Sequence, residues 1–289
     1  MNPMPRVASI VIPAHNEEHR IRPLMAVLSE PCIASLYDAY VICNGCTDHT
    51  REVAEEYPNV RVVEIEQQGK HYALNEGDRL AGDVFPRLYC DADIDTTAES
   101  IRALVDALCT DSVRVAGPTV NYGLNRSSWA VGFYVRAITS ELTLRWHNEH
   151  LMGRGVYGAS RAARQRFGEF PDLVADDLFF DRLFSLEEKV IVADSRVTVW
   201  MPSNLHTLVR GEIRVAEGNQ QYLMHGEGKL PASGRLKRWL AGRRQASRRW
   251  RTDVRVRDVV PLAFYFCVTT AAKATLAIRK VRGHQIEWR

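Results

Sequence analysis

The 289-residue sequence lacks several features that mark whole classes of protein. It has no run of 18 or more uncharged apolar residues, no internal repeat and no low-complexity tract. These absences exclude a multi-spanning membrane protein and a repeat protein. The opening segment, MNPMPRVASIVIP, has no basic stretch followed by a long apolar stretch and a cleavage site, so we do not expect export. Six scattered cysteines are too few for a disulfide framework in so long a chain, which makes a reducing cytoplasm the expected compartment.

The composition is that of a globular protein with an uneven distribution of charge. Apolar residues make up 46% of the chain and charged residues 25%, which suits one large domain or a domain with an appendage. The net charge of +3 conceals a split, because residues 235–289 hold 15 Lys and Arg against 3 Asp and Glu. The body is therefore acidic and the tail basic. An acidic body that binds an anionic substrate needs a metal or a few well-placed arginines, whereas a basic tail suits a membrane surface or nucleic acid.

The first hundred residues alternate between two kinds of apolar pattern. Short β-branched runs predict buried strands at 7–12, 38–43, 60–65 and 84–90, and helical spacing predicts helices at about 17–30, 48–57 and 69–82. Strands that alternate with helices form a mainly parallel sheet. We therefore expect an α/β fold in which helices flank a central sheet, as in Rossmann-like proteins.

Beyond residue 95 the alternation continues and then loosens. The patterns predict a helix at 96–109, a strand near 112–121, a long helical segment at 127–152, a glycine-bounded loop at GRGVYG (153–158), a helix that begins at VADD, and the strands KVIVAD and VTVW. The segment EGKLPASG (227–234) indicates a linker. The expected organisation is a domain at 1–226, this linker, and a basic and apolar helical extension at 235–289.

Polar residues follow each of the first four predicted strands. Ligands of open α/β sheets bind at the carboxyl ends of the strands, so these residues are the first candidates for a site. They are His15, Asn16 and Glu17 after the first strand, Asn44 and Asp48 after the second, Lys70 after the third, and Asp91, Asp93 and Asp95 after the fourth. Four strand ends are thus expected to converge on one crevice.

The segment CDADID places Asp91 and Asp93 two residues apart on an extended stretch that leaves a buried strand. Both carboxylates can then reach one cation and its ligands. Mg or Mn prefers oxygen ligands and often takes only one or two protein carboxylates, with phosphate oxygens and water completing its shell. The alternative is a solvated acidic loop or a helix N-cap, since isolated pairs of this kind are common.

Four segments in order carry a family resemblance. VIPAHNEE, VICNGCTDHT, GKHYALNEG and LYCDADI, followed by the acidic pair Asp176 and Asp177, resemble glycosyltransferase family 2. The resemblance covers about residues 6–220 and rests on the order and spacing of motifs that are weak one by one. It implies the GT-A fold, a nucleotide-diphosphate sugar as the donor, and inversion of the anomeric centre in one displacement.

The resemblance also implies roles for residues of the donor site. Pro13, His15 and Glu17 would line the nucleotide pocket, with the backbone near Ala14 at the base or ribose. Asn44 stands where many members have an aspartate that contacts the base, and an amide both donates and accepts, which leaves the choice of base open. The remaining donor-site residues are Lys70 near the donor, Asp91 at the ribose or sugar, and Asp93 at a divalent cation, Mn or Mg.

The general base is expected in the acidic pair at the start of the VADD helix. The resemblance matches Asp177 to the usual catalytic aspartate and Asp176 to the acid before it. A carboxylate beside another carboxylate has a raised pKa, which helps it to accept a proton from the acceptor hydroxyl. The alternative for such a pair by itself is a set of helix-start acids favoured by the helix dipole.

Two arginines are candidates for the positive charge that stabilises the leaving diphosphate. Arg210 and Arg214 lie four residues apart in LHTLVRGEIRVAEGN, with His206 one turn earlier. Many relatives carry an arginine motif here, although the common QxxRW form is absent. The alternative is a solvated helix face.

Two other patterns compete with this interpretation. GRGVYG matches the dinucleotide fingerprint GxGxxG, but the preceding LRWHNEHLM favours a helix, whereas the fingerprint needs a strand that leads into the first glycine. Cys43, Cys46 and His49 form C-x2-C-x2-H, but no second pair lies at zinc-finger spacing. We therefore expect buried cysteines there.

The basic tail precedes a long apolar segment. Ten Lys and Arg with Trp239 and Trp250 lead into VVPLAFYFCVTTAAKATLAI, a combination typical of an interfacial membrane anchor. Packing of the tail on the body and a true membrane span are the alternatives, and Lys273 argues against the span. We expect peripheral attachment and no nucleic-acid partner.

These inferences lead to one expected function. The chain would be a metal-dependent inverting glycosyltransferase at the inner face of the cell membrane, acting on a lipid-linked or cell-surface glycan. A sugar nucleotidyltransferase is less favoured, because PAHNEE is not a glycine-rich phosphate loop with an arginine. A non-catalytic membrane or nucleic-acid binding module is the alternative from another class.

Overall fold

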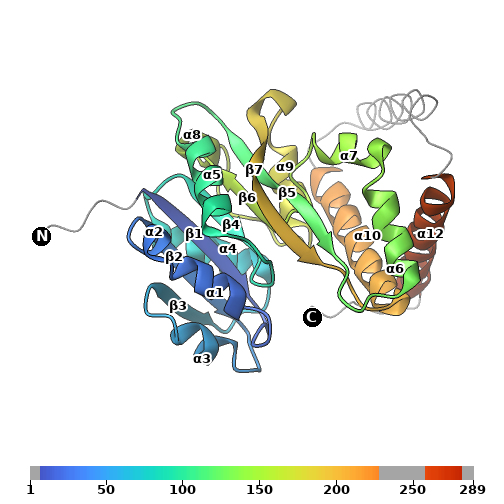
Figure 1. Ribbon diagram of the computed structural model, residues 1–289, viewed down its shortest axis with the longest axis horizontal. Coiled ribbons are helices and arrows are strands. Elements are labelled where there is room, and N and C mark those ends of the chain that lie inside the picture. Colours follow the sequence, from blue (N-terminus) through green and yellow to red (C-terminus); the bar gives the residue numbers. More distant parts are fainter. Residues whose placement is uncertain (1–6, 228–257, 282–289) are drawn as a thin grey trace, which may run out of the picture.

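The structure, a computed structural model, describes residues 7–227 and 258–281 and centres on one seven-stranded sheet (Figure 1). In the order in which they lie, the strands are β3 (Val60–Ile65), β2 (Tyr37–Asn44), β1 (Ala8–Ala14), β4 (Arg87–Cys90), β6 (Val156–Ala159), β5 (Val115–Gly123) and β7 (Lys189–Trp200). Strand β6 is antiparallel to both of its neighbours, and the other described pairs are parallel. The mainly parallel sheet predicted from the sequence is confirmed.

Helices cover both faces of the sheet. On one face lie α1 (Arg22–Leu28), α2 (Pro31–Ala34), α3 (Thr50–Glu55) and α5 (Ala98–Leu108), and on the other α4 (Lys70–Ala81), α8 (Arg161–Arg164) and α9 (Asp176–Arg182). All seven residues of β1 are buried, with Ile10 and Ile12 in the first core and Val11 in the second. This alternation follows from the two-residue period of a strand, and it explains why β1 is apolar throughout.

Three predicted elements differ in extent from the observed ones. The helix predicted at 17–30 begins only at Arg22, because residues 17–21 form a turn in which Ile21 N donates to Glu17 O. The strand predicted at 84–90 is limited to Arg87–Cys90, since Pro86 has no N–H to donate to a neighbouring strand. The two strands KVIVAD and VTVW are a single strand, β7, whose pairing with β5 shifts register between Pro118 and Thr119.

The helix predicted at 127–152 is broken into two pieces. They are α6 (Trp129–Ile138) and α7 (Glu141–His147). At the break, Thr139 Oγ1 donates to the carbonyl of Val135 at 2.8 Å, and Thr143 Oγ1 donates to that of Ala137 at 2.9 Å. Hydroxyl groups that compete for backbone carbonyls in this way weaken the ladder of a helix.

Strand β6 was not predicted, because it occupies part of the GRGVYG segment expected to be a loop. Gly153 and Gly155 have left-handed φ angles of 67° and 69° and form the turn that leads into the strand. Within the strand, a Cβ on Gly158 would lie 2.4 Å from the Leu88 side chain, so only glycine allows β6 to approach β4 this closely. A four-residue strand with two small residues has too little apolar pattern to be recognised.

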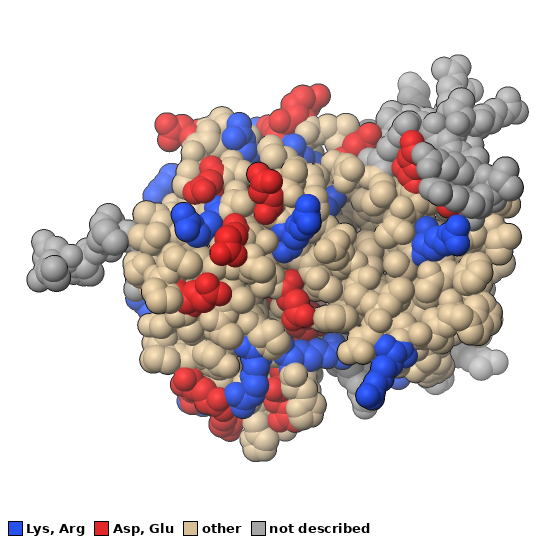
Figure 2. All heavy atoms as spheres, viewed as in Figure 1, with Lys and Arg blue, Asp and Glu red and all other residues tan. Residues whose placement is uncertain are grey.

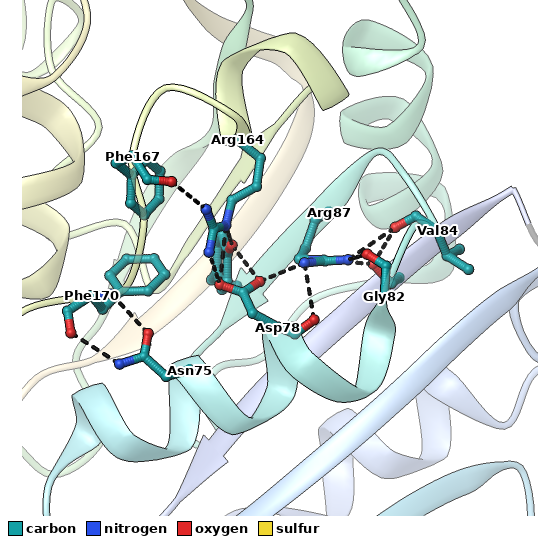
Figure 3. A network of polar contacts seen from close by, with 10 residues as sticks. Asn75, Asp78, Gly82, Val84, Arg87, Arg164, Phe167 and Phe170 are labelled. Atoms are coloured by element: carbon teal, nitrogen blue, oxygen red, sulfur yellow. Dashed lines mark hydrogen bonds and ion pairs between the residues drawn. The ribbon is translucent and has the colours of Figure 1, made fainter.

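A buried ionic network joins α4, β4 and α8 beneath the sheet (Figure 3). The Asp78 carboxylate accepts hydrogen bonds from Arg87 Nη1 at 2.7 Å, Arg164 Nη2 at 2.6 Å and the Tyr89 hydroxyl at 2.8 Å. The Arg87 side chain is only 3% exposed and also donates to the carbonyl of Gly82. Because one carboxylate serves two arginines and a tyrosine, the network fixes α4 relative to β4.

Three helices form a separate layer at one end of the sheet (Figure 1). Helices α10 (Leu205–Glu227) and α12 (Val259–Val281) pack against each other, and α12 also packs against α6. On α12, Val268, Ala272 and Leu276 are buried in these contacts. The described part of the predicted extension therefore packs on the body, whereas 228–257, with Trp239 and Trp250, lies outside the described residues.

The outer face of α12 is apolar. Val260, Phe266 and Ile278 are exposed, and on the face seen in Figure 2 uncharged residues predominate over this end of the molecule. Within the described residues, Val259–Arg279 is the one helical segment long and apolar enough to cross a membrane, judged by length and composition.

Candidate active site

Lys70 joins two acidic segments at the carboxyl ends of the strands. Its Nζ lies 2.7 Å from Asp91 Oδ1 and 3.0 Å from Asp176 Oδ1. Asp91 directly follows β4, and Asp176 is the first residue of α9. Burial acts to lower the pKa of Lys70, but the charges of Asp176 and Asp91 outweigh burial and raise that pKa. Lys70 is therefore cationic and holds the two segments together.

Asp176 and Asp177 are adjacent in sequence but have different partners. Asp176 is 4% exposed, and its second oxygen accepts a hydrogen bond from the Tyr157 hydroxyl at 2.7 Å. Asp177 Oδ2 accepts the Gly153 N–H at 2.7 Å. Burial, followed by the charge of Asp176, raises the pKa of Asp177 to about 6. Asp177 Oδ1 also accepts the Leu178 N–H at 2.7 Å, so protein groups hold both carboxylates. Asp177 is the one of the two that lines a cavity, and its raised pKa gives it raised basicity there.

A second acidic cluster surrounds Asp93. The Arg20 guanidinium lies 3.2 Å from Asp93 Oδ2 and supplies a positive charge from the loop after β1. Burial and the neighbouring Asp91 raise the pKa of Asp93, although Arg20 opposes this. Burial, with Asp93 as the next cause, raises the pKa of Glu17 to about 7. These carboxylates lie close enough to repel one another, so a bound cation would relieve the repulsion.

The residues after β1 and β2 are locked together at the predicted nucleotide site. Pro13 and Ala14 are buried at the end of β1, and His15 Nδ1 lies 2.7 Å from the backbone carbonyl of Asn44. The Asn44 side chain is 1% exposed, and its amide nitrogen donates to Ala14 O at 2.7 Å while its oxygen accepts the Gly69 N–H at 3.3 Å. Asn44 therefore ties β1 and β2 to the start of α4 from below.

Asp48 fixes the loop that carries Glu17. Its Oδ2 accepts the backbone N–H of Glu18 at 3.2 Å, and its Oδ1 accepts that of Thr50 at 3.0 Å. The Thr50 hydroxyl in turn accepts the Glu17 N–H at 2.7 Å. The polar residues after β1 and β2 thus form one interlocked pair of loops, which holds the Glu17 side chain toward the acidic cluster.

A cavity of about 150 Å³ lies where these elements meet. It brings together Asp177, Lys70 and the CDADID segment, which come from three distant parts of the sequence. Its lining residues are Lys70, Asp91, Asp93, Ile94, Gly153, Arg154, Gly155, Tyr157, Asp177, Val199 and Trp200. Of the four predicted strand ends, those of β3 and β4 supply residues that line this cavity, whereas the residues after β1 and β2 are not among its lining residues.

Arg210 and Arg214 are not among the residues that line this cavity. Both are exposed on α10. The part of α10 that approaches the site is one to two turns further along, where a Cβ on Gly218 would lie 2.9 Å from Ala175 Cβ. The structure thus does not bring the two predicted arginines together with the acidic residues.

Several lining residues were missed by sequence reasoning. Tyr157 lies in the segment expected to be a loop, of which the family resemblance implied only that its glycines line the site, and Trp200 is the last residue of the predicted strand VTVW. Arg154 is 4% exposed and donates to the backbone carbonyls of His150, at 2.8 Å, and Pro118. Burial lowers its pKa to about 10. The position of Trp200 at a strand end was the available signal, since the other site residues follow strand ends too.

The acidic residues fit a hard cation that is shared with a ligand. Among the described residues, no three or more His, Cys, Asp and Glu side chains are grouped to hold a metal by themselves. Asp93 already attracts a cationic group, Arg20, and is surrounded by carboxylates. Mg and Mn commonly use one or two carboxylates together with phosphate oxygens and water, and this donor set suits such an arrangement.

Comparison with known families agrees with this site. The family model described as Glycosyl transferase family 2 matches residues 9–162. The match includes β1 to β6 and the segments that carry His15, Lys70 and Asp93. The chain belongs to glycosyl transferase family 2, and its fold is GT-A.

Individual relatives are more distant. The chain is 30% identical over 121 residues to glycosyltransferase AglE of Haloferax volcanii, a match that covers 39% of each chain, so it spans about two fifths of the length of that curated relative. Mannosyltransferase PcManGT from Pyrobaculum calidifontis, solved with GDP-Man and Mn²⁺, superposes with a TM-score of 0.59 at 18% identity over 97% of this chain and 80% of that one. Glucosyl-3-phosphoglycerate synthase from Mycobacterium tuberculosis, solved with Mn²⁺, UDP and glucosyl-3-phosphoglycerate, gives 0.53 at 21% identity over 73% and 78%.

Proposed function

We propose that the chain transfers a sugar from a nucleotide-diphosphate sugar to an acceptor hydroxyl, with inversion at the anomeric carbon. The observation that carries this proposal is the cavity in which Asp177 lies together with Lys70, Asp91 and Asp93. A displacement reaction needs a base that activates the attacking hydroxyl and groups that stabilise the leaving diphosphate, and this cavity offers both. Family membership supports the same reaction class.

Asp177 takes the proton in the proposed reaction. The acceptor oxygen forms a bond to the anomeric carbon as its proton passes to Asp177, and the bond from that carbon to the diphosphate oxygen breaks. The leaving diphosphate departs from the opposite side, which inverts the centre. The pKa of about 6 keeps Asp177 largely ionised at neutral pH, and it also makes Asp177 a better proton acceptor than an ordinary aspartate.

The donor is held by the loops after β1, β2 and β4. Pro13, Ala14 and His15 border the nucleotide, above the buried Asn44. Asp93 would hold Mn or Mg, which would offset the charge of the diphosphate, and Arg20, 3.2 Å from Asp93, adds a positive charge beside it. The relatives solved with GDP-Man or UDP and with Mn²⁺ support a donor and cation of this kind.

A panel of nucleotide sugars tests the donor site. We expect one of the UDP, GDP or dTDP sugars to raise the melting temperature in the presence of Mn²⁺, because a ligand bound only by the folded state stabilises it. Asp93→Ala should abolish this shift. Asp83→Ala is the matched control, since Asp83 is 92% exposed and pairs with Arg161 away from the cavity. Absence of a shift with every donor would contradict the proposal.

We further propose that the acceptor is a lipid-linked or cell-surface glycan at the inner face of the cell membrane. Support comes from the exposed apolar face of α12, where Phe266 is 40% and Ile278 54% exposed, and from the ten Lys and Arg that precede this helix in the sequence. A basic segment beside an apolar helix face is suited to an anionic lipid surface.

Sedimentation of the full chain with lipid vesicles tests this contact. We expect binding to vesicles that contain phosphatidylglycerol and weaker binding to phosphatidylcholine alone. The double variant Phe266→Glu, Ile278→Glu should bind several-fold less. Leu186→Glu is the control, because Leu186 is 52% exposed but lies on the 3-10 helix η1 (Leu186–Glu188), which directly precedes β7 and is not part of α12. Equal vesicle binding by all three proteins would contradict a role for α12.

A further inference from the structure

We propose that Trp200 is the platform on which the acceptor binds, and that this acceptor is an uncharged pyranose rather than a phosphate or a carboxylate. This inference rests on the proposed function and names the acceptor class of the same site. Trp200 is 49% exposed and lines the cavity that also holds Asp177. A sugar ring that stacks on Trp200 therefore lies beside the proposed base.

The indole ring is held in place on two sides. Its Nε1 donates to Asp95 Oδ2 at 2.6 Å. One part of the ring lies against Gly123, where an added Cβ would be 2.4 Å from Trp200 Cε3. A half-exposed tryptophan with a fixed ring offers a flat apolar surface at little cost in side-chain entropy. The C–H groups of a pyranose form such a flat apolar face, while its hydroxyls remain available for hydrogen bonds.

Asp95 has no other assigned role in the site. It is the third carboxylate of CDADID, and its backbone forms two hydrogen bonds with Thr198, at 3.2 Å and 2.7 Å. These bonds fix Asp95 next to β7, two residues before Trp200. The segment that supplies Asp93 for the donor thus also positions the ring proposed for the acceptor.

The charge around Trp200 selects among acceptors. A larger groove of about 540 Å³ adjoins Asp95, and it is lined by hydroxyl groups together with Glu99, Asp194 and Arg196. With Asp95 included, three carboxylates line this groove with one guanidinium. In the cavity, Asp91, Asp93 and Asp177 outnumber Lys70 and Arg154, and Lys70 is already paired with Asp91 and Asp176. Anionic acceptors are repelled by this arrangement, whereas sugar hydroxyls are good partners for carboxylates and hydroxyls. The groove has room for further residues of a glycan.

The test separates donor chemistry from acceptor binding. We would measure two reactions, hydrolysis of the donor by water and transfer of its sugar to an acceptor. The uncharged acceptors are the methyl glycosides of glucose, mannose and N-acetylglucosamine. The phosphate acceptors are 3-phosphoglycerate and a short-chain polyprenyl phosphate. Wild-type protein should transfer to at least one methyl glycoside in preference to both phosphates. Trp200→Ala should raise the KM for that glycoside at least about tenfold, a clearly larger factor than its effect on the donor KM measured by donor hydrolysis. Trp200→Phe should restore much of the loss.

Two controls keep the outcome clear. Trp129→Ala, which removes a tryptophan that is 75% exposed on α6, should leave every parameter unchanged. An unchanged acceptor KM in Trp200→Ala, or a preference for either phosphate acceptor, would overturn this inference while donor hydrolysis still supports the proposed function. Absence of donor binding and of hydrolysis in the wild type would overturn the proposed function, and with it this inference.

Discussion

At the scale of single residues, Asp177 is the group whose replacement is most informative. Asp177→Asn keeps the size of the side chain and one oxygen, which can accept either the Gly153 or the Leu178 N–H but not both. It cannot take a proton from the acceptor. We therefore expect transfer to fall by a factor of about 10² to 10⁴. Donor binding, measured as the rise in melting temperature in the presence of Mn²⁺, should be retained. A variant that keeps most of its activity would show that another group is the base.

The raised pKa of Asp177 predicts two opposite dependences on pH. Activity should rise with pH around a midpoint of about 6, because only the ionised form accepts a proton. Stability should change the other way, because the folded-state pKa of Asp177 lies above the usual aspartate value of 3.8. Its protonation stabilises the native state fully below about pH 4, and this contribution is lost as the pH rises through 6. Chemical unfolding should therefore show the stability of Asp177→Asn relative to wild type rising by up to about 2 kcal/mol between pH 4 and pH 8. An equal difference at both pH values would contradict the assignment.

Sequence reasoning was more successful for some residues than for others. Lys70, Asp91 and Asp177 follow the ends of predicted strands or begin a predicted helix, and the structure brings them to one cavity. Arg210 and Arg214 were placed by helical spacing and by the arginine motif that many relatives carry here, and helical spacing says which residues share a helix face but not where that face points. Tyr157 was out of reach, because its hydrogen bond to Asp176 depends on a strand that the sequence did not reveal.

At the scale of elements, the Asp78 network determines how α4 is seated. Asp78→Ala leaves the guanidinium groups of Arg87 and Arg164 buried without their carboxylate. Breaking a buried ionic contact on one side is strongly destabilising, so we expect a loss of about 3 kcal/mol or more in the free energy of unfolding. Asp83→Ala, which removes an exposed partner of Arg161, should cost less than about 1 kcal/mol. Similar losses in urea denaturation for both variants would show that the network does not stabilise the fold.

The predictability of the elements follows their apolar patterns. Strands β1 and β2 are buried along their whole length and were found with nearly correct bounds. The bounds of α6 and α7 were missed because hydroxyl-to-backbone bonds at Thr139 and Thr143 interrupt a pattern that is otherwise continuous. Strand β6 depends on a close approach to β4 through Gly158, and such contacts between distant segments leave no local pattern.

At the scale of the whole molecule, α12 has one face packed on the body and one face exposed. Leu276 and Ile278 lie two residues apart on this helix, but they are 4% and 54% exposed. Leu276→Ala should lower the free energy of unfolding by about 2 to 3 kcal/mol, because it leaves a cavity against α10. Ile278→Ala should change it by less than about 0.5 kcal/mol. Equal effects of the two variants on thermal unfolding would show that α12 does not pack on the body in solution.

The position of β6 has a consequence for how the protein is made. This strand lies between β4 and β5 in the sheet but follows both of them in the chain. Directly next to the β4–β6 pairing, Asp91 N donates to Gly155 O at 2.8 Å. During synthesis, the parallel block of β1 to β4 and the single strand β5 therefore leave the ribosome before β6, and β7, the parallel partner of β5, leaves after it. Pairings between segments so far apart in sequence form slowly, because a long loop must close first. The proposed active site is thus complete only when β6 has paired with β4 and β5, near the end of folding.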